Sequence, residues 1–464
     1  MANMSLKKVI MPEQLADVRN GNFEEVALGY TYEQAIEEAG RCLNCKHRPC
    51  VNGCPVNVPI PEFIEALAKE DIEEAYKILT SENRLPAICG RVCPQEKQCE
   101  ALCVRGIKGE PVGVGRLERF VADYYMAHFK DEESEIVKNN VPVAVVGSGP
   151  AGLTCSAELA TMGYDVTLFE ALHELGGVLV YGIPEFRLPK KLVKAEIDKV
   201  LELGVHVEKN VIVGKSITID ELLEDGYKAI FIGSGAGLPR FMNVPGENLN
   251  GVYSSNEFLT RVNLMKAYKY PEYPTPVIIG DRVAVVGAGN VAMDSARTAK
   301  RLGAKEVYII YRRSDNEIPA RAEEVHHAKE EGIIFNLLTN PVAVHGEDAK
   351  VKSIECVKME LGEPDASGRR RPVTIPESKF IMEMDTVIVA IGQTPNPLIK
   401  NTTADLEVTK WGGILVNEDT LETSLAGVYA GGDAVTGAAT VILAMGAGKT
   451  AAKAIDQKLK ATVK

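Results

Sequence analysis

Two stretches of the chain combine a short apolar strand, a glycine-rich turn and a helix. They are VAVVGSGPAGL at 143–153 and VAVVGAGNVAMD at 283–294. After each comes a second apolar strand, and then a further strand that closes on glycine, at 228–237 and at 385–397. The repeated strand–helix–strand pattern predicts two similar dinucleotide-binding domains.

The N-terminal part of the chain has a different pattern. Apolar residues recur at helical spacing at 60–83 and at 115–130, and eight cysteines lie between residues 42 and 103. This combination predicts a small helical domain folded around the cysteines. The whole chain is therefore expected to be an α/β protein, with two Rossmann-like domains preceded by a helical domain.

Composition narrows the class of protein. A chain of 464 residues is too long for one core and predicts about three domains. The net charge of -12 argues against binding to nucleic acid or to an anionic membrane. The N-terminus has no signal-peptide pattern, and no apolar run reaches the ~18 residues that span a bilayer. We therefore expect a cytoplasmic protein, in which clustered cysteines bind metal instead of forming disulfides.

The cysteines fall into two blocks of four, namely Cys42, Cys45, Cys50 and Cys54, then Cys89, Cys93, Cys99 and Cys103. Structural zinc is the alternative, but zinc sites usually pair two C-x-x-C knuckles, and only Cys42 and Cys45 have that spacing. The first block is similar to the bacterial ferredoxin run, in which the last, proline-followed cysteine binds the other cluster. Its middle gap is four residues instead of two. Eight thiolates predict two 4Fe-4S clusters with interleaved ligands, and the residues alone favour Cys89 as a ligand.

The first glycine-rich loop carries a full dinucleotide fingerprint. Gly147 permits the tight turn, Gly149 lets the backbone approach a pyrophosphate, and Gly152 lets the helix pack on the strand. Glu170 ends the second strand and can accept hydrogen bonds from ribose hydroxyls. Near the C-terminus Gly432 and Asp433 follow another strand, where Asp433 is expected to contact a flavin; an ordinary helix cap is the alternative.

The second loop repeats the plan with Gly287, Gly289 and Ala292. The acidic residue is missing, and Arg312 and Arg313 stand at the end of the second strand. Guanidinium groups bind a 2′-phosphate that a carboxylate would repel. This favours NADP(H) over NAD(H), with a solvated strand end as the alternative. The basic run at 368–372 is expected to be a solvated loop.

With these parts in order, the chain resembles the small (β) subunit of NADPH-dependent glutamate synthase. It also resembles the large subunit of NADH-dependent ferredoxin:NADP oxidoreductase and the N-terminal half of dihydropyrimidine dehydrogenase. The most specific string is LGGVLVYGIPEFRLPK at 175–190, which in the family lies beside the flavin. NVAMDSARTAKRLGA, AIGQTPNP and AGGDAVTGAATVILAMGAG also match.

The resemblance implies a glutathione-reductase-like pair of domains with a discontinuous FAD domain. The boundaries that follow are 1–138 for the iron–sulfur domain, 139–250 with 393–464 for the FAD domain, and 251–392 for the NADP(H) domain. The resemblance adds Gly177, Ala439 and Thr440 to the cofactor contacts. It also implies two cluster ligand sets, Cys42, Cys45, Cys50 and Cys103 for one and Cys54, Cys93, Cys99 and Glu118 for the other. Cys89 would then be a bystander.

The implied activity is electron transfer between NADP(H) and a larger partner subunit through FAD and two 4Fe-4S clusters, without a catalytic side chain beyond the bound FAD. A glutaminase and an FMN barrel do not fit into this length, because a barrel alone takes ~250 residues. The chain is therefore expected to be an electron-input module. The alternatives are the transhydrogenase large subunit and a docking module with only diaphorase activity. A thioredoxin-reductase-like enzyme is disfavoured, because the second dinucleotide domain contains only Cys356.

Overall fold

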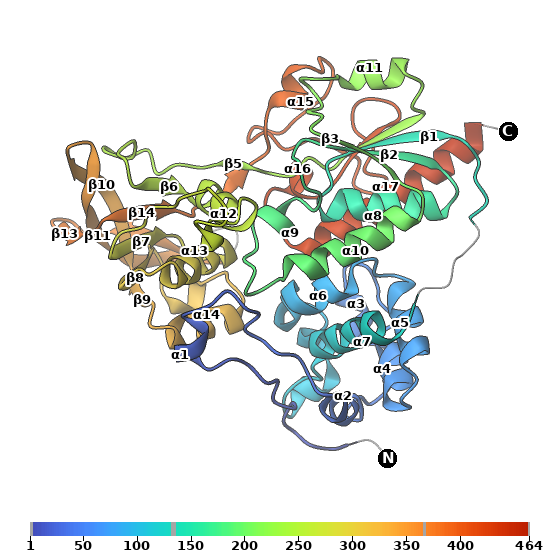
Figure 1. Cartoon of the computed structure of the whole chain (residues 1–464), viewed down its shortest axis with the longest axis horizontal. Helices are drawn as coiled ribbons and strands as arrows, with labels where there is room; N and C mark the ends of the chain where they lie inside the picture. The colour runs from blue at the N-terminus through green and yellow to red at the C-terminus, as the bar shows by residue number, and fades with distance from the viewer. Residues whose placement is uncertain (1–2, 131–135, 365–367, 463–464) are drawn as a thin grey trace.

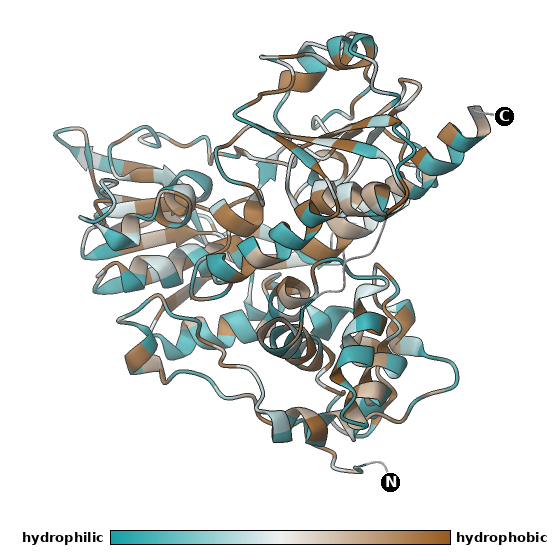
Figure 2. Cartoon of the chain, turned by 45° about the vertical axis from the view of Figure 1, so that its right-hand side comes forward, coloured by the Kyte–Doolittle hydropathy of each residue, from teal (hydrophilic) through white to brown (hydrophobic). Residues whose placement is uncertain are grey.

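Two parallel five-stranded sheets form the centre of the molecule, and a helical N-terminal part packs beneath one of them (Figure 1). The computed structural model describes residues 3–130, 136–364 and 368–462. Hydrophobic residues concentrate on the strands and on helix faces turned toward them, whereas outer helix faces are polar (Figure 2). Within the described residues, no helix combines the length and apolar character needed to cross a membrane.

The first sheet has the strand order β16-β4-β1-β2-β3. Its strands are β1 (Pro142–Val146), β2 (Asp165–Glu170), β3 (His206–Lys209), β4 (Ala229–Ile232) and β16 (Val428–Ala430). Nearly every residue of β1 and β4 is buried, as expected for parallel strands covered on both faces. The chain leaves this sheet after β4 and returns to it only at β16.

The second sheet is built between these two points, with the order β6-β14-β7-β8-β9. Its strands are β6 (Val252–Ser254), β7 (Arg282–Val286), β8 (Glu306–Tyr311), β9 (Ile334–Leu337) and β14 (Thr386–Val389). In each sheet three successive parallel strands lie side by side (β1-β2-β3 and β7-β8-β9), and a later strand pairs on the other side of the first of them (β4 and β14). The predicted pair of similar Rossmann-like domains is therefore confirmed. The two chain crossings between the sheets pair with each other as β5 (Leu238–Pro239) and β15 (Gln393–Thr394).

An antiparallel sheet extends the second domain. It consists of β10 (Thr339–Glu347), β11 (Lys350–Pro364), β12 (Arg370–Thr374) and β13 (Phe380–Glu383). The expectation of a loop at 368–372 is wrong from residue 370 on, because Arg370–Pro372 belong to β12, although Arg370 and Arg371 are exposed to solvent as expected. There Pro372 lies opposite Leu361 of β11.

Three helices separate the first sheet from the N-terminal domain, namely α8 (Pro150–Thr161), α10 (Lys190–Glu202) and α17 (Val441–Thr462) (Figure 1). Short helices α9 (Val178–Tyr181), α11 (Ile219–Glu224), α15 (Leu398–Asn401) and α16 (Asp433–Thr436) complete this domain. The second sheet carries α12 (Ser255–Asn263), α13 (Asn290–Arg301) and α14 (Ala322–Glu330).

The N-terminal domain is helical, as predicted. Its helices are α1 (Ala16–Arg19), α2 (Tyr32–Ala39), α3 (Pro49–Asn52), α4 (Ile60–Ala68), α5 (Ile72–Thr80), α6 (Pro86–Val92) and α7 (Val114–His128), with 3-10 turns at Gln95–Lys97, Glu100–Leu102 and Val104–Ile107. The apolar residues of α4 and α5 face the core, and Asp71 caps α5 by accepting from the Glu74 backbone N–H. Helix α6 packs against α7, α10 and α17, so it joins the cysteine blocks to the first sheet.

Candidate functional site

The first glycine-rich loop is shaped by two different steric demands. Gly147 has φ +95°, and a Cβ on Gly152 would lie 1.8 Å from the Gly147 carbonyl oxygen, so the helix approaches the loop too closely for any side chain. A Cβ on Gly149 would meet no atom within 4 Å. The space beside Gly149, at the N-terminus of α8, is therefore free, as the predicted approach of a pyrophosphate requires.

Glu170 is buried and holds this loop in place. One of its carboxylate oxygens accepts from the Ser148 N–H (3.0 Å) and the Ser148 hydroxyl (2.5 Å), and the other accepts from the Leu172 N–H (2.8 Å). The predicted ribose acceptor therefore also fixes the turn that carries Gly149. Ser148 was not recognised from the sequence, since nothing in its spacing distinguishes it.

The C-terminal loop closes over the same edge of the first sheet. Gly432 (φ +66°) abuts α8, since its Cβ would lie 3.1 Å from the Ala151 Cβ, and Gly177 (φ +54°) backs onto Gly149 in the same way. Asp433 accepts from the Ala439 N–H at 3.1 Å, and burial raises the pKa of this carboxyl. The structure thus brings these residues to the mouth of the first loop.

Two further polar groups belong to this edge. Thr440 caps α17 by accepting from the Leu443 N–H (3.3 Å). Tyr181 has a pKa raised to about 12, first by burial and then by the charges of Asp433 and Glu170. The Tyr181 hydroxyl therefore stays protonated near neutral pH and can donate a hydrogen bond.

The second glycine-rich loop repeats the geometry of the first. Gly287 (φ +130°) faces the Ala390 carbonyl, and a Cβ on Gly289 would again meet nothing within 4 Å. Ala292 is fully buried where α13 packs on its sheet. The Asn290 side chain at the start of α13 accepts from the Arg321 backbone N–H (2.9 Å).

The two arginines after β8 have different surroundings. Arg312 is exposed, whereas Arg313 is buried and donates through Nε to the Arg370 carbonyl of β12 (2.9 Å). Arg370 in turn pairs with Glu317 at 2.9 Å. The antiparallel sheet therefore holds Arg313 through a backbone carbonyl, while the Arg370 side chain is already paired with Glu317.

Four cysteines line one pocket at the outer side of the helical domain, namely Cys42, Cys45, Cys50 and Cys103. The remaining lining is mainly apolar and includes Ile60, Ile64 and Val112. Burial, followed by the neighbouring Cys42 and Cys103, raises the pKa of Cys50 to about 11. Thiolates gathered in such a site need a compensating positive charge, which the iron atoms of a cluster supply.

A second group lies deeper, where Cys93 and Cys99 are buried and Cys54 is partly buried. Glu118 joins them from α7. Burial raises the pKa of Glu118 to about 8, although Asn83 opposes the shift by donating to its Oε1 at 2.6 Å. A buried carboxyl beside three thiols is costly as an anion unless a cation accompanies it, so this group also fits a cluster.

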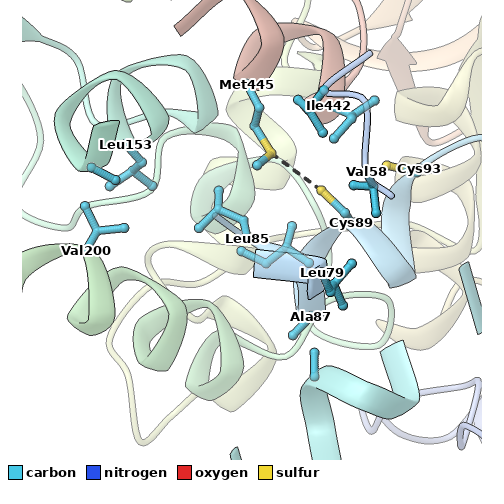
Figure 3. Packing of buried hydrophobic residues seen from close by; sticks show 14 of the residues in the cluster. Val58, Leu79, Leu85, Ala87, Cys89, Cys93, Leu153, Val200, Ile442 and Met445 are labelled. Carbon is cyan, nitrogen blue, oxygen red and sulfur yellow. Dashed lines mark hydrogen bonds between the residues drawn. The ribbon is translucent and has the colours of Figure 1, made fainter. Parts of the chain in front are cut away.

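Cys89 lies next to this group, where its thiol contacts Cys93 and Asn83 on one side and apolar side chains on the other. Its Sγ is 3.5 Å from the Met445 Sδ of α17, among side chains that include Leu85 and Ile442 (Figure 3). The Asn83 side chain contacts both candidates, since its Oδ1 is 3.7 Å from the Cys89 Sγ. Among the described residues, no three His, Cys, Asp or Glu side chains are grouped tightly enough to bind a single metal ion together.

Comparisons with known proteins identify the two parts of the chain. Residues 19–130 match the family described as dihydropyrimidine dehydrogenase domain II, 4Fe-4S cluster, and residues 141–457 match that described as pyridine nucleotide-disulphide oxidoreductase. The chain is 35% identical to the glutamate synthase (NADPH) small chain of Halomonas elongata, over 95% of this chain and 94% of that one. The chain belongs to the family of the glutamate synthase small subunit. This confirms the resemblance seen in the sequence.

The family also includes longer proteins. The chain is 41% identical to the NADP(+)-dependent formate dehydrogenase subunit beta of Moorella thermoacetica, over 89% of this chain but only 60% of that relative. Among solved structures, Mycobacterium tuberculosis FprA in complex with NADPH shares the fold, with a TM-score of 0.59 and 20% identity over 70% of this chain and 86% of that one. The protein is an NADPH-dependent oxidoreductase with FAD and 4Fe-4S clusters.

Proposed function

We propose that this protein is the electron-input subunit of a larger enzyme, in which two clusters connect the flavin to a partner protein. The observation that carries the proposal is the placement of the two cysteine groups. The inner group touches the flavin-domain helix α17, and the outer group lies near the surface. A flavin reductase that used only small acceptors would not need such a chain of sites.

The inner contact is direct. A Cβ on Gly446 of α17 would lie 3.1 Å from the Pro55 carbonyl oxygen, so the helix runs against the peptide that follows Cys54. The same helix begins at the loop that carries Asp433 and Ala439. Its first turns therefore link the proposed flavin site to the inner cysteine group, which supports electron transfer between them.

The outer group is bordered by exposed apolar side chains. Leu43, Leu102 and Val104 are each more than a third exposed, and each is adjacent in sequence to a cysteine of this group. Apolar side chains at an electron-exit site are typical of a surface that a second protein covers. We assign this group to the far cluster and the inner group to the near cluster.

Each cofactor has a distinct set of residues to hold it. FAD, when bound, exchanges hydride with nicotinamide and single electrons with clusters. We assign FAD to the loops of Gly147–Gly152 and Gly432–Thr440, with Glu170 and Gly177, and NADP(H) to the loop of Gly287–Ala292 with Arg312 and Arg313. The side chains bind and orient these groups and exclude water from them, and none is required as an acid or base.

We assign the clusters to Cys42, Cys45, Cys50 and Cys103, and to Cys54, Cys93, Cys99 and Glu118. Iron content tests the assignment, because two four-iron clusters require about eight irons per chain. Cys89→Ser should keep the full iron content, whereas Glu118→Ala should lose or alter one cluster. The reverse result would make Cys89 the ligand, and stoichiometric zinc with little iron would exclude clusters.

The partner is proposed to be a larger subunit of the glutamate synthase type, because the alignment with that small chain runs over nearly all of both chains. With NADPH, the isolated chain should reduce artificial acceptors but make no glutamate from glutamine and 2-oxoglutarate. Addition of the large subunit should restore glutamate formation. Glutamate formation by the chain alone would contradict the proposal. We place the reaction in the cytoplasm, where clustered thiols stay reduced.

The higher identity to the formate dehydrogenase subunit favours a second candidate, electron exchange with a dehydrogenase partner. A third candidate is that the chain is the large subunit of a ferredoxin-linked transhydrogenase. Purification of the native complex and identification of the co-eluting subunit separates these candidates, since each requires a different large chain.

A further inference from the structure

The segment between Cys93 and Cys99 does more than connect two proposed cluster ligands. It reaches across to the NADP(H)-binding domain, where it contacts residues 319–322. Lys97 Nζ donates to the Pro319 carbonyl at 3.0 Å, and the Glu96 carboxylate accepts from the Ala322 N–H at 3.2 Å. The cluster segment thus holds the backbone that leads into α14.

Arg321 makes the strongest part of this contact. It is 93% buried, and its guanidinium donates to the Arg91 carbonyl (2.6 Å) at the end of α6 and to the Gln95 Oε1 (3.3 Å) inside the cluster segment. A third bond goes to Glu323 at 3.0 Å. A lysine could not reproduce this fork, because its ammonium is a single point charge.

The acceptor Gln95 is itself held firmly. It is buried, and its Nε2 donates to the Cys89 carbonyl (3.2 Å). A Cβ on Gly115 would lie only 2.1 Å from that nitrogen, so Gln95 has no room to move toward α7. The position of Gln95 therefore follows the backbone that presents the cysteines.

The backbone of Arg321 points the other way, toward the nucleotide loop. Its N–H donates to the Asn290 Oδ1 at 2.9 Å, and Asn290 directly follows Gly289, beside which the space for a pyrophosphate lies. One residue therefore touches the cluster segment with its side chain and the nucleotide loop with its main chain.

We propose that Arg321 is a positioning residue through which the inner cluster site braces the nucleotide loop, so that affinity for NADP(H) depends on that cluster being in place. The inference rests on the assignment of NADP(H) to the loop at 287–292. Loss of the cluster would shift Gln95 and Arg91, which accept hydrogen bonds from the buried Arg321 guanidinium. Arg321 would then move, and its backbone N–H would no longer hold the Asn290 side chain. By linkage, bound NADP⁺ stabilises the cluster to the same degree.

The test measures the Kd for NADP⁺ by calorimetry on anaerobically purified holoprotein. Arg321→Lys and, separately, Gln95→Leu should raise Kd at least fivefold, the low end of typical coupling between sites. Iron content and the kcat at saturating NADPH should stay near the wild-type values. His326→Gln, on the exposed face of the same helix α14, is the matched control and should leave Kd unchanged.

The decisive measurement is a double-mutant cycle with the cluster. Cys99→Ala, which should remove the inner cluster, should raise Kd in the wild-type background but add little in the Arg321→Lys background. Fully additive effects, or a Kd unaffected by cluster loss, would overturn the inference. If Cys99→Ala does not fold, Glu118→Ala, which should lose or alter the same cluster, takes its place in the cycle with Arg321→Lys.

The Gly289→Ala variant tests the assignment of NADP(H) to the loop at 287–292 independently of the proposed role of Arg321. The alanine methyl would enter the open space beside the loop without touching protein. If NADP⁺ binds weakly to Gly289→Ala but normally to Arg321→Lys, the proposed role of Arg321 is wrong and the assignment of the nucleotide loop stands. Normal binding in Gly289→Ala would remove the nucleotide-loop assignment itself.

Discussion

Gly149 and Gly152 of the first loop both lack a side chain, but for different physical reasons. At Gly152 the obstacle is the protein itself, because a Cβ would collide with the Gly147 carbonyl. At Gly149 the backbone is extended (φ −68°, ψ 179°) and accepts any residue, and the space in front is free. The two positions therefore separate the demands of folding from those of cofactor binding.

Alanine at each position should show this difference. Gly149→Ala should lose most of its FAD while it keeps its fold, because the methyl group fills space that only a cofactor uses. Gly152→Ala should instead destabilise the protein by roughly 1–3 kcal/mol through overpacking. Flavin absorbance per chain after desalting and thermal unfolding measure the two effects. Full flavin content in Gly149→Ala would show that the pyrophosphate lies elsewhere.

At the scale of elements, the string at 175–190 connects the domains. Arg187 pairs with Asp294 of α13 (2.7 Å) and with Glu324 of α14 (3.1 Å), while Asn263 donates to the Tyr181 carbonyl (3.2 Å). The string therefore carries Gly177 against Gly149 of the first glycine-rich loop and, ten residues later, the Arg187 side chain that is anchored in the other domain. One segment therefore reaches the first glycine-rich loop and is also anchored in the second dinucleotide domain.

The loop after β8 provides a second prediction at this scale. Arg312→Ala should raise the KM for NADPH about tenfold or more and spare stability, because a charged hydrogen bond contributes about 1.5–3 kcal/mol and Arg312 is exposed. Arg313→Ala should also lower the free energy of unfolding, since it loses the bond to the Arg370 carbonyl. The KM for NADH is the control. Equal effects on both nucleotides would show that these arginines do not bind the 2′-phosphate.

At the scale of the whole molecule, a buried carboxylate ties the N-terminus to the second dinucleotide domain. Glu331 is fully buried and pairs with Arg19 (2.9 Å), Arg297 (2.8 Å) and Arg301 (2.7 Å). The N-terminal segment thus reaches along α14, far from the cysteines that follow it (Figure 1). The domains are held together by charge as well as by apolar packing.

Removal of the Glu331 charge should lower the free energy of unfolding. Burial alone would raise the pKa of Glu331, but Arg297 and Arg301 outweigh it and lower the pKa from 4.5 to about 2. Since the folded-state pKa is depressed, the stabilisation is complete above about pH 4.5 and is lost as the pH falls toward 2. Glu331→Gln should therefore destabilise the protein by about 3 kcal/mol at pH 7. The difference from wild type, measured by urea unfolding, should shrink as the pH falls below 4.5; a constant difference would contradict the ionic explanation.

Features that depend on local geometry could be predicted from the residues alone. A glycine that must turn, a strand buried on both faces and a proline-followed cysteine are properties of a few neighbouring residues, so the two Rossmann-like domains, the helical domain and the classes of cofactor could be predicted. The boundaries at 138, 250 and 392 and the assignment of single residues to cofactors stay predictions.

Features that depend on contacts between distant segments could not be predicted and are seen only in the folded chain. The residues alone favour Cys89 over Glu118 as a ligand, and that choice stays a prediction. Spacing cannot reveal that Asn83, in the loop between α5 and α6, contacts both side chains, or that Cys89 also faces Met445 of α17. The roles of Arg370 and Arg321 likewise depend on partners more than fifty residues away. Burial and hydrogen-bond partners are set by packing of whole elements, so residue type alone does not determine them.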